Sequence, residues 1–296
     1  MNVEKKYTVS IVIPTYCRKD SLLKALRSVV DLDWDPFDRE IIIVDDGSRD
    51  GTVEELERVG KSIVGFRYIK QANLGPAIAR NAGVNISTGE FIFFMDDDCV
   101  AEKSWIRESI KLFSDPEVGG VGGTITYRPP NNSWANKCAA HEASGCGQPV
   151  DRQGRLQYLI TANAAVRKIA FKQVGGFDKV FRYAAHEDID LSYRLLANHW
   201  KLALSLNSNV DHYHDFNFIG MLVRSYQIGI AEKILCFKSK EKVSKLKNLV
   251  LAFWGLFLII PGFLKNYVNG IEISISFGKP FIYRLAKLAN AIGKLG

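Results

Sequence analysis

Five apolar residues run directly into three carboxylates in the stretch FIFFMDDD (residues 91–98), and this stretch decides the fold. A short, continuous apolar run predicts a strand buried on both faces, as in a sheet covered by helices on each side. The acids then follow the strand at its C-terminal end, where open α/β sheets bind their ligands. Three adjacent carboxylates favour a cation, and oxygen ligands suit Mg²⁺ or Mn²⁺ bridged to a phosphate group. A solvated acidic turn is the alternative interpretation.

The sequence before this stretch repeats the same strand-and-helix pattern. Apolar runs predict strands at residues 9–13, 40–44 and 66–69, and helical patterns begin near residues 20, 50 and 76. This alternation predicts an α/β fold with a right-handed, doubly wound and mostly parallel sheet of Rossmann-like halves. The first strand has no GxGxxG fingerprint after it, which argues against a dinucleotide-binding enzyme.

Polar residues follow two further predicted strands. Thr15 and Tyr16 come directly after the first strand, and Asp45 and Asp46 come at the end of the second. The carboxyl ends of parallel strands meet at one edge of a sheet, so these side chains should converge with the acids of residues 96–98. A carboxylate there can accept a hydrogen bond from the ring N–H of a nucleotide base, and Tyr16 can stack on it. A helix-capping turn remains the simpler interpretation of the two aspartates.

Composition and charge limit the classes of protein. The chain has 296 residues, 47% of them hydrophobic and 24% charged, which is enough for one large α/β domain with an appendage. Its five cysteines are scattered and contain no CxxC pair, which argues against a disulfide framework and a structural zinc site and indicates a reducing compartment. The N-terminus shows no apolar secretory signal after its charges.

The C-terminal part differs from the rest. Residues 233–296 hold 11 lysines and arginines against two glutamates, although the whole chain carries a net charge of only +7. Within this tail, residues 248–264 are uncharged and aromatic-rich, and residues 280–295 have an amphipathic pattern. These features predict a helical region that binds an anionic membrane surface, with a short transmembrane or re-entrant segment at 248–264 as an alternative. Nucleic acid is not expected, because the basic residues flank apolar segments. We therefore predict two domains, 1–232 and 233–296.

Six motifs, in order, resemble family 2 glycosyltransferases with the GT-A fold. They are SIVIPTYCR (10–18), IIIVDDGSRDGT (41–52), NLGPAIARNAGV (73–84), FIFFMDDDC (91–99), the pair NAAVRK (163–168) with VGGFD (174–178), and HEDIDLSYR (186–194). The resemblance covers roughly residues 8–215 and implies a nucleotide-sugar donor. The residues implied to bind that donor are Pro14, Thr15, Tyr16, Arg18, Asp45, Asp46, Gly75, Arg80, Asp96 and Asp97. Among these, Arg80 would face the donor phosphates.

The resemblance also implies a metal site and a catalytic base. The cofactor would be Mn²⁺ or Mg²⁺, with Asp96, Asp98 and a histidine as ligands; we favour His212 over His214. Both histidines follow a predicted strand with Leu202, Leu204 and Leu206 on one face. Inverting sugar transfer needs a carboxylate to accept the proton of the attacking hydroxyl. The matching residue is Asp188, with Glu187 holding the acceptor or orienting the base. Both acids open a helix, where capping is the ordinary role of an acid.

These observations predict a metal-dependent inverting glycosyltransferase. It would move one sugar from a nucleotide-diphosphate donor, expected to be a UDP-sugar, to a hydroxyl of a lipid-linked or glycan acceptor. We expect it at the cytoplasmic face of a membrane, in the biosynthesis of a cell-envelope polysaccharide. A nucleotidyltransferase that makes nucleotide sugars is one alternative, although the first strand lacks a glycine-rich phosphate loop after it. A non-catalytic sugar- or lipid-binding module is the other.

Overall fold

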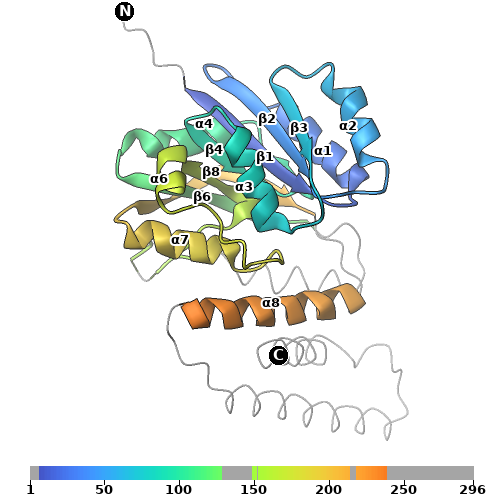
Figure 1. Ribbon diagram of the computed structural model, residues 1–296. Coiled ribbons are helices and arrows are strands. Elements are labelled where there is room, and N and C mark those ends of the chain that lie inside the picture. Colours follow the sequence, from blue (N-terminus) through green and yellow to red (C-terminus); the bar gives the residue numbers. More distant parts are fainter. Residues whose placement is uncertain (1–6, 129–148, 152, 214–217, 239–296) are drawn as a thin grey trace, which may run out of the picture. The chain divides into compact units, whose positions relative to one another are not determined.

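The computed structural model describes residues 7–128, 149–151, 153–213 and 218–238 (Figure 1). These residues belong to two compact units. The first holds the sheet and the helices packed on it and ends at Tyr213, and the second contains helix α8 (Phe218–Lys238). The predicted domain boundary at residue 232 falls inside α8 and stays a prediction.

The first unit is built on one eight-stranded sheet, in the order β3-β2-β1-β4-β7-β6-β8-β5. The strands are β1 (Thr8–Thr15), β2 (Asp38–Asp45), β3 (Phe66–Lys70), β4 (Phe91–Phe94), β5 (Cys99–Ala101), β6 (Val118–Tyr127), β7 (Ala164–Arg167) and β8 (Lys201–His212). The β1–β2, β1–β4, β2–β3 and β6–β8 pairs are parallel, and the β4–β7, β6–β7 and β5–β8 pairs are antiparallel. The sheet is therefore mixed.

The N-terminal half of the sheet confirms the sequence prediction. Strands β3, β2, β1 and β4 are parallel neighbours, and the side chains of β4 are buried on both faces. Thr15 pairs with Asp45 in the β1–β2 register, so both stand at the carboxyl edge. The acids of residues 96–98 follow β4 at this same edge, as expected for the ligand-binding side of an open sheet.

The prediction of two Rossmann-like halves is wrong for the second half. Ala164, the first residue of β7, pairs with Phe94, the last residue of β4, so β7 begins at the carboxyl edge and runs the opposite way. A parallel neighbour would need a crossover that returns the chain to the other edge. Here the chain enters β7 through a short 3₁₀ helix at Thr161–Asn163, directly at the carboxyl edge, and an antiparallel strand follows.

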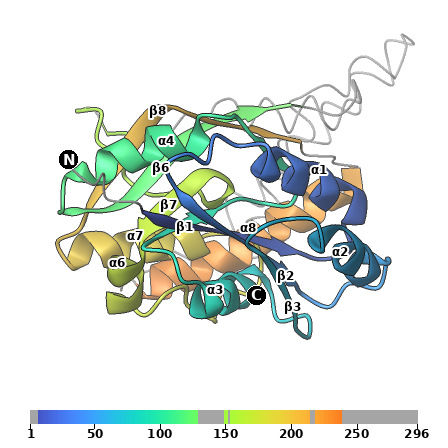
Figure 2. The same cartoon turned by 90° about the horizontal axis from the view of Figure 1, so that it is seen from above.

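Helices cover the two faces of the sheet (Figure 2). Residues of α1 (Lys19–Val30), α2 (Thr52–Gly60) and α4 (Trp105–Ile110) pack in one apolar core, and residues of α3 (Pro76–Ile86), α6 (Lys168–Gln173) and α7 (Glu187–Ala197) pack in the other. Alternate residues of β1 divide between them: Ile11 belongs to the first core and Val12 to the second. This alternation is the period of two expected for a strand buried on both faces.

Local interactions set the helix starts. The first helical pattern is predicted to begin near residue 20, and α1 begins at Lys19. The Asp50 carboxylate accepts hydrogen bonds from the backbone N–H of Lys19 (3.0 Å) and of Thr52 (3.3 Å). One aspartate therefore satisfies free N–H groups at the starts of both α1 and α2, which is the role of a capping side chain. These starts lie near the carboxyl edge, so Asp50 also fixes the loops around the site.

Two leucines of α7 and β8 are exposed at the surface. Leu191 and Leu195 of α7 are buried, but Leu196 is 41% exposed. Leu206 of β8 is 69% exposed, and the register between β6 and β8 shifts beside it, between Gly123 and Thr124. An irregularity of this kind interrupts the alternation of inward and outward side chains. Strand β8 then continues to His212, which is therefore the last residue of the strand and does not follow it as predicted.

Several predicted features of the C-terminal region fall outside the residues that the structure describes. They are the segments 248–264 and 280–295, and His214. Among the described helices, none combines the length and apolar character needed to cross a membrane. The membrane role of the tail therefore stays a prediction.

Candidate active site

Main-chain hydrogen bonds join the carboxyl ends of β1 and β2. The backbone N–H of Asp46 donates to the carbonyl of Thr15 (2.8 Å), and Ser48 N–H donates to Asp45 Oδ1 (3.0 Å). The Ser48 hydroxyl in turn accepts from the backbone N–H of Cys17 (2.8 Å). Asp45 Oδ2 is buried and has no hydrogen-bond partner among the described residues. A buried, unpaired carboxylate oxygen is costly, so it is an available acceptor for a ligand N–H or O–H group.

Asp46 organises the loop before α3. Its two carboxylate oxygens accept from Gln71 Nε2 (2.7 Å) and from the backbone N–H of Leu74 and Gly75 (2.9 Å each). Gly75 has a φ of +97°, and a Cβ there would collide with the carbonyl oxygen of Arg182. Glycine is therefore required by both the backbone conformation and the close packing. The structure gives Asp46 and Gly75 this positioning role, and their contact with a donor stays a prediction.

Arg18 and Thr15 hold the middle of the acidic triplet. Thr15 Oγ1 donates to Asp97 Oδ2 (2.7 Å), while Arg18 Nη1 binds Asp97 Oδ1 (3.1 Å) and Asp98 Oδ2 (2.8 Å). Burial raises the pKa of Asp97 to about 6, although the Arg18 charge opposes the shift. Burial would lower the pKa of Arg18, but the charges of Asp97 and Asp98 outweigh it and raise that pKa. Arg18, half exposed, thus neutralises two clustered carboxylates.

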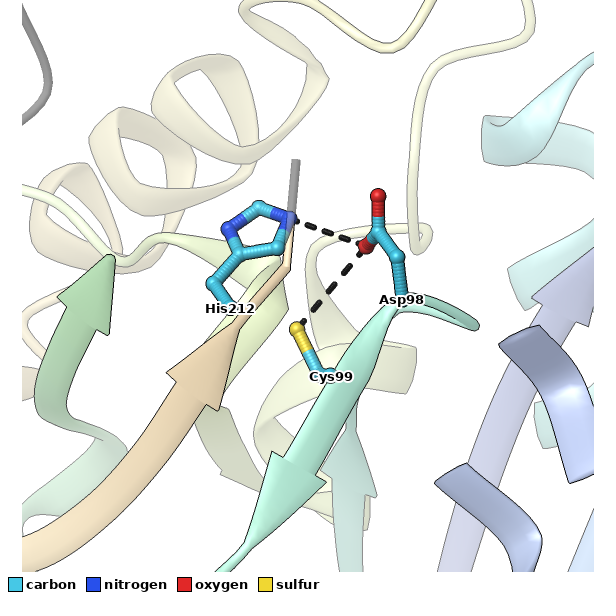
Figure 3. Close-up of side chains that lie close together, drawn as sticks. All are labelled: Asp98, Cys99 and His212. Carbon is cyan, nitrogen blue, oxygen red and sulfur yellow. Dashed lines mark hydrogen bonds and ion pairs between the residues drawn. The ribbon is translucent and has the colours of Figure 1, made fainter. Parts of the chain in front are cut away.

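Asp98 and His212 form a candidate cation site (Figure 3). Asp98 Oδ1 lies 2.9 Å from His212 Nε2, and both side chains are buried. Cys99 Sγ lies 4.0 Å from Asp98 Oδ1, and the three ligand atoms all lie within 4.8 Å of one another. One carboxylate oxygen, one imidazole nitrogen and one sulfur, all buried together, fit a divalent cation. Asp98 and His212 are ligands expected from the sequence, whereas nothing in the local sequence marks Cys99.

Asp96 points to a different partner. Arg80 of α3 donates through Nη2 to Asp96 Oδ1 (2.7 Å) and through Nη1 to Glu187 Oε1 (2.8 Å). The Arg80 side chain is only 2% exposed and that of Glu187 is 3% exposed. Among the described residues, Arg80 Nε and Glu187 Oε2 are buried without a hydrogen-bond partner. Asp96 lies outside the close group of cation ligands, so its proposed metal contact remains untested.

The charges around Arg80 shift each other's protonation. Burial raises the pKa of Glu187 to about 7, and repulsion from Asp188 adds to this, whereas the Arg80 charge opposes it. Burial would lower the pKa of Arg80, but Asp96 and Glu187 outweigh it and raise that pKa. Glu187 is therefore a buried partner of Arg80. Of the two roles expected from the sequence, this geometry favours orienting the base over holding the acceptor.

Asp188 lies at the first turn of α7 and is partly exposed. Its Oδ1 accepts from the backbone N–H of Ile189 (2.9 Å), and its Oδ2 lies 3.4 Å from the N–H of Thr161. Burial raises the pKa of Asp188, and Arg80 opposes the shift. Ser192 fixes this turn, since its hydroxyl donates to the Asp188 carbonyl (2.6 Å) and accepts from the N–H of Leu159 (2.9 Å). A carboxylate with a raised pKa, held at a fixed turn, is suited to accepting a proton.

The structure thus brings most of the predicted residues to one edge of the sheet. Thr15 and Arg18 contact the acids after β4, and Arg80 links those acids to α7. Tyr16 is exposed at the end of β1, where it is open to stacking. Pro14 is an ordinary buried strand residue opposite Val44, and its donor contact stays a prediction.

Comparison with known proteins adds independent information. The model of the family described as "Glycosyl transferase family 2" matches residues 10–175. A curated relative, the glycosyltransferase AglE of Haloferax volcanii, is 27% identical over 170 residues, which is 57% of this chain and 55% of the relative. The chain spans about half the length of the first curated relatives that it matches.

Solved structures share the fold at low sequence identity. The mannosyltransferase PcManGT from Pyrobaculum calidifontis, solved with GDP-Man and Mn²⁺, has a TM-score of 0.62 and 15% identity, covering 99% of this chain and 75% of that one. Staphylococcus aureus TarS 1–349, solved with UDP-GlcNAc, has a TM-score of 0.55 and 16% identity, covering 74% of this chain and 66% of that one. At this identity the likeness concerns the fold, which is of the GT-A type.

Proposed function

The chain belongs to glycosyl transferase family 2, and from this we propose that it is a metal-dependent, inverting glycosyltransferase. It moves one sugar from a nucleotide-diphosphate donor, with a UDP-sugar as first candidate, to a hydroxyl of a lipid-linked or glycan acceptor. One observation carries the proposal: Arg80 bridges Asp96, after β4, to Glu187, beside Asp188. Arg80 therefore links the acids after β4, which form the donor-binding end of the site, to the turn of α7 that carries Asp188, whose pKa is raised.

The donor end holds the nucleotide and the cation. Asp98 and His212 would ligate Mn²⁺ or Mg²⁺, which supplies positive charge to stabilise the departing diphosphate. Asp45 contributes its unpaired Oδ2 as an acceptor for the base or ribose, and Tyr16 stacks on the base from its exposed position. The Arg18 side chain is half exposed and forms ion pairs with Asp97 and Asp98. It can therefore move to contact the donor diphosphate when the charge at the site changes.

Asp188 is the proposed base. One of its carboxylate oxygens accepts the proton of the acceptor hydroxyl as that oxygen attacks the anomeric carbon, and the configuration inverts because the attack comes from the side opposite the diphosphate. The backbone N–H groups of Ile189 and Thr161 fix the carboxylate orientation. A raised pKa makes Asp188 a stronger base than an aspartate in water, while Arg80 keeps it ionised.

Glu187 and Arg80 position the base and do not touch the acceptor. Both side chains are almost fully buried, and their ion pair links α7 to α3. Burial of both charges makes the position of the first turn of α7 depend on this pair. The phosphate contact expected for Arg80 from the sequence stays a prediction, and Arg80 Nε is free of hydrogen-bond partners among the described residues.

The proposed acceptor and the proposed cellular location are inferred from the C-terminal sequence. The basic excess of residues 233–296 and the uncharged segment 248–264 support binding to an anionic membrane surface. A lipid-linked acceptor would lie in that surface, so we place the reaction at the cytoplasmic face of a membrane. Cell-envelope polysaccharide synthesis is a process that uses such acceptors.

A donor screen tests the proposal. The full chain is incubated with UDP-, GDP- and dTDP-sugars, with Mn²⁺ or Mg²⁺ and with a chelator, and release of the nucleoside diphosphate is measured. We expect one nucleotide class to be hydrolysed slowly in the presence of metal and not with chelator. No metal-dependent release from any donor, with binding of none of them, would contradict the proposed activity.

A further inference from the structure

Cys99 lies beside the cation ligands that the proposed function uses. Its Sγ, Asp98 Oδ1 and a His212 ring nitrogen form the only close group of three such ligands found among the described residues. Cys99 is 1% exposed, whereas Cys17 is exposed and Cys236 is half-buried on α8. Cys99 also packs within an apolar core, so filling space is its simplest role.

The backbone places this thiol at the site. Strands β5 and β8 pair antiparallel, with Cys99 directly opposite His212. Residues directly opposite each other in such a pair project to the same face with their Cβ atoms about 4.5–5.5 Å apart. Asp98 precedes Cys99, and its carbonyl accepts from the backbone N–H of Tyr213 (2.8 Å). The three ligands are therefore held together by the strand register, and the side chains converge in Figure 3.

The distances allow one ion to bind both Asp98 and Cys99, with the His212 ring nitrogen 2.9 Å from the same Asp98 oxygen. Zinc lies about 2.3 Å from a thiolate sulfur and about 2.0–2.2 Å from a carboxylate oxygen, so one ion can bridge a sulfur and an oxygen up to about 4.4 Å apart. Asp98 Oδ1 and Cys99 Sγ are 4.0 Å apart. Sulfur favours soft and borderline ions such as Zn²⁺ or Co²⁺, while Mg²⁺ and Mn²⁺ favour oxygen.

We propose that Cys99 supplies a thiolate ligand to the Asp98–His212 site, so that thiophilic divalent cations bind there and displace Mn²⁺ or Mg²⁺. The S–H bond breaks as the metal–sulfur bond forms, the proton passes to solvent, and no oxidation state changes. Three protein ligands leave one position of a four-coordinate ion for the donor diphosphate. Zn²⁺ therefore competes with Mn²⁺ or Mg²⁺ for this site. This inference rests on the proposed function, because it places a competitor at the ion site of that reaction.

Cobalt is the probe for the sulfur ligand. Co²⁺ is added to the full chain without donor or acceptor, and the near-ultraviolet spectrum is recorded for the wild type, Cys99→Ala, Cys99→Ser and Cys236→Ala. We expect a sulfur-to-cobalt charge-transfer band in the wild type and in Cys236→Ala, and its loss in both Cys99 variants. Circular dichroism confirms that the variants fold. A band that survives in a folded Cys99 variant overturns the inference.

Calorimetry then tests the metal preference. Replacing even an indirect partner of a metal ligand costs about 10–100-fold in affinity, so Cys99→Ala should weaken Zn²⁺ binding by at least about tenfold. Mn²⁺ affinity should stay close to that of the wild type, because this ion gains little from sulfur. Equal losses for both ions, or none for Zn²⁺, overturn the inference. These measurements need no turnover, so a failed donor screen with an intact cobalt band would count against the proposed function alone.

Discussion

Replacing Arg80 with methionine tests whether the buried ion pair organises the site. Methionine keeps much of the length of the side chain but removes the charge that Glu187 and Asp96 share. Breaking a buried pair by removing one partner costs about 3–5 kcal/mol, because the other charge is left uncompensated. Since Arg80 and Glu187 are almost fully buried, we expect Arg80→Met to lower the free energy of unfolding by about this amount at pH 8.

The loss of stability in Arg80→Met should depend on pH, and the pKa of Glu187 determines whether this loss increases or decreases as pH rises. Its pKa is about 7 in the folded protein, above its ordinary value of 4.5, although Arg80 lowers it. A carboxyl group with a raised folded pKa contributes stability that is lost as pH rises through that pKa. Without Arg80 the pKa rises further, so Glu187 in the variant stays protonated to higher pH and then ionises unpaired. The stability difference between wild type and Arg80→Met should therefore be larger at pH 8 than at pH 5.5.

Urea denaturation followed by circular dichroism at both pH values measures this effect. The matched control is Arg58→Met, which removes an exposed ion pair with Glu55 and should leave the unfolding midpoint close to that of the wild type. Adding Glu187→Gln to Arg80→Met should recover part of the loss, as expected for coupled neighbours. If Arg80→Met matches the control in stability but loses donor affinity, Arg80 is a phosphate ligand and the positioning role is refuted.

Three further changes test other parts of the site. Gly75→Ala should destabilise the protein by about 1–3 kcal/mol in thermal denaturation, because the residue has a φ of +97° and faces the Arg182 carbonyl; an unchanged midpoint would show that the loop can relax. Asp98→Ala should abolish Mn²⁺-dependent donor binding in calorimetry, and unchanged binding would mean that the ligand set is wrong. Glu187→Gln removes an acid that shares the Arg80 charge with Asp188, so the acid limb of the pH–rate profile should move to lower pH. A limb that moves to higher pH would exclude Asp188 as the titrating base.

The parallel half of the fold could be predicted because each strand carries its own local signal. The strands at residues 9–13, 40–44 and 91–94 are rich in apolar residues, and polar residues follow each of them. The antiparallel half has no such signal: β7 has four residues and β5 three, and β6 begins with a glycine-rich run. The directions of such strands are set by tertiary packing, which overrides weak local preference.

The candidate site likewise contains some residues that could be predicted from the sequence and others that could not. Asp98, Asp188 and His212 were found through motif resemblance and residue type. The Arg80–Glu187 pair joins residues 107 positions apart, and the position of Cys99 depends on the register of β5 against β8. Neither has a signal in the local sequence. A single thiol in an apolar run is ordinary core material until the opposite strand is known.

The central claim is that Asp188 accepts the proton of the incoming hydroxyl while the donor and its cation are held elsewhere. The most direct measurement is the turnover of Asp188→Asn at saturating donor and Mn²⁺, with donor affinity determined on the same sample. General-base catalysis contributes about 10²–10⁴-fold, so turnover should fall by this factor while donor affinity stays near the wild-type value. Turnover at the wild-type rate, with the donor bound, would contradict the account.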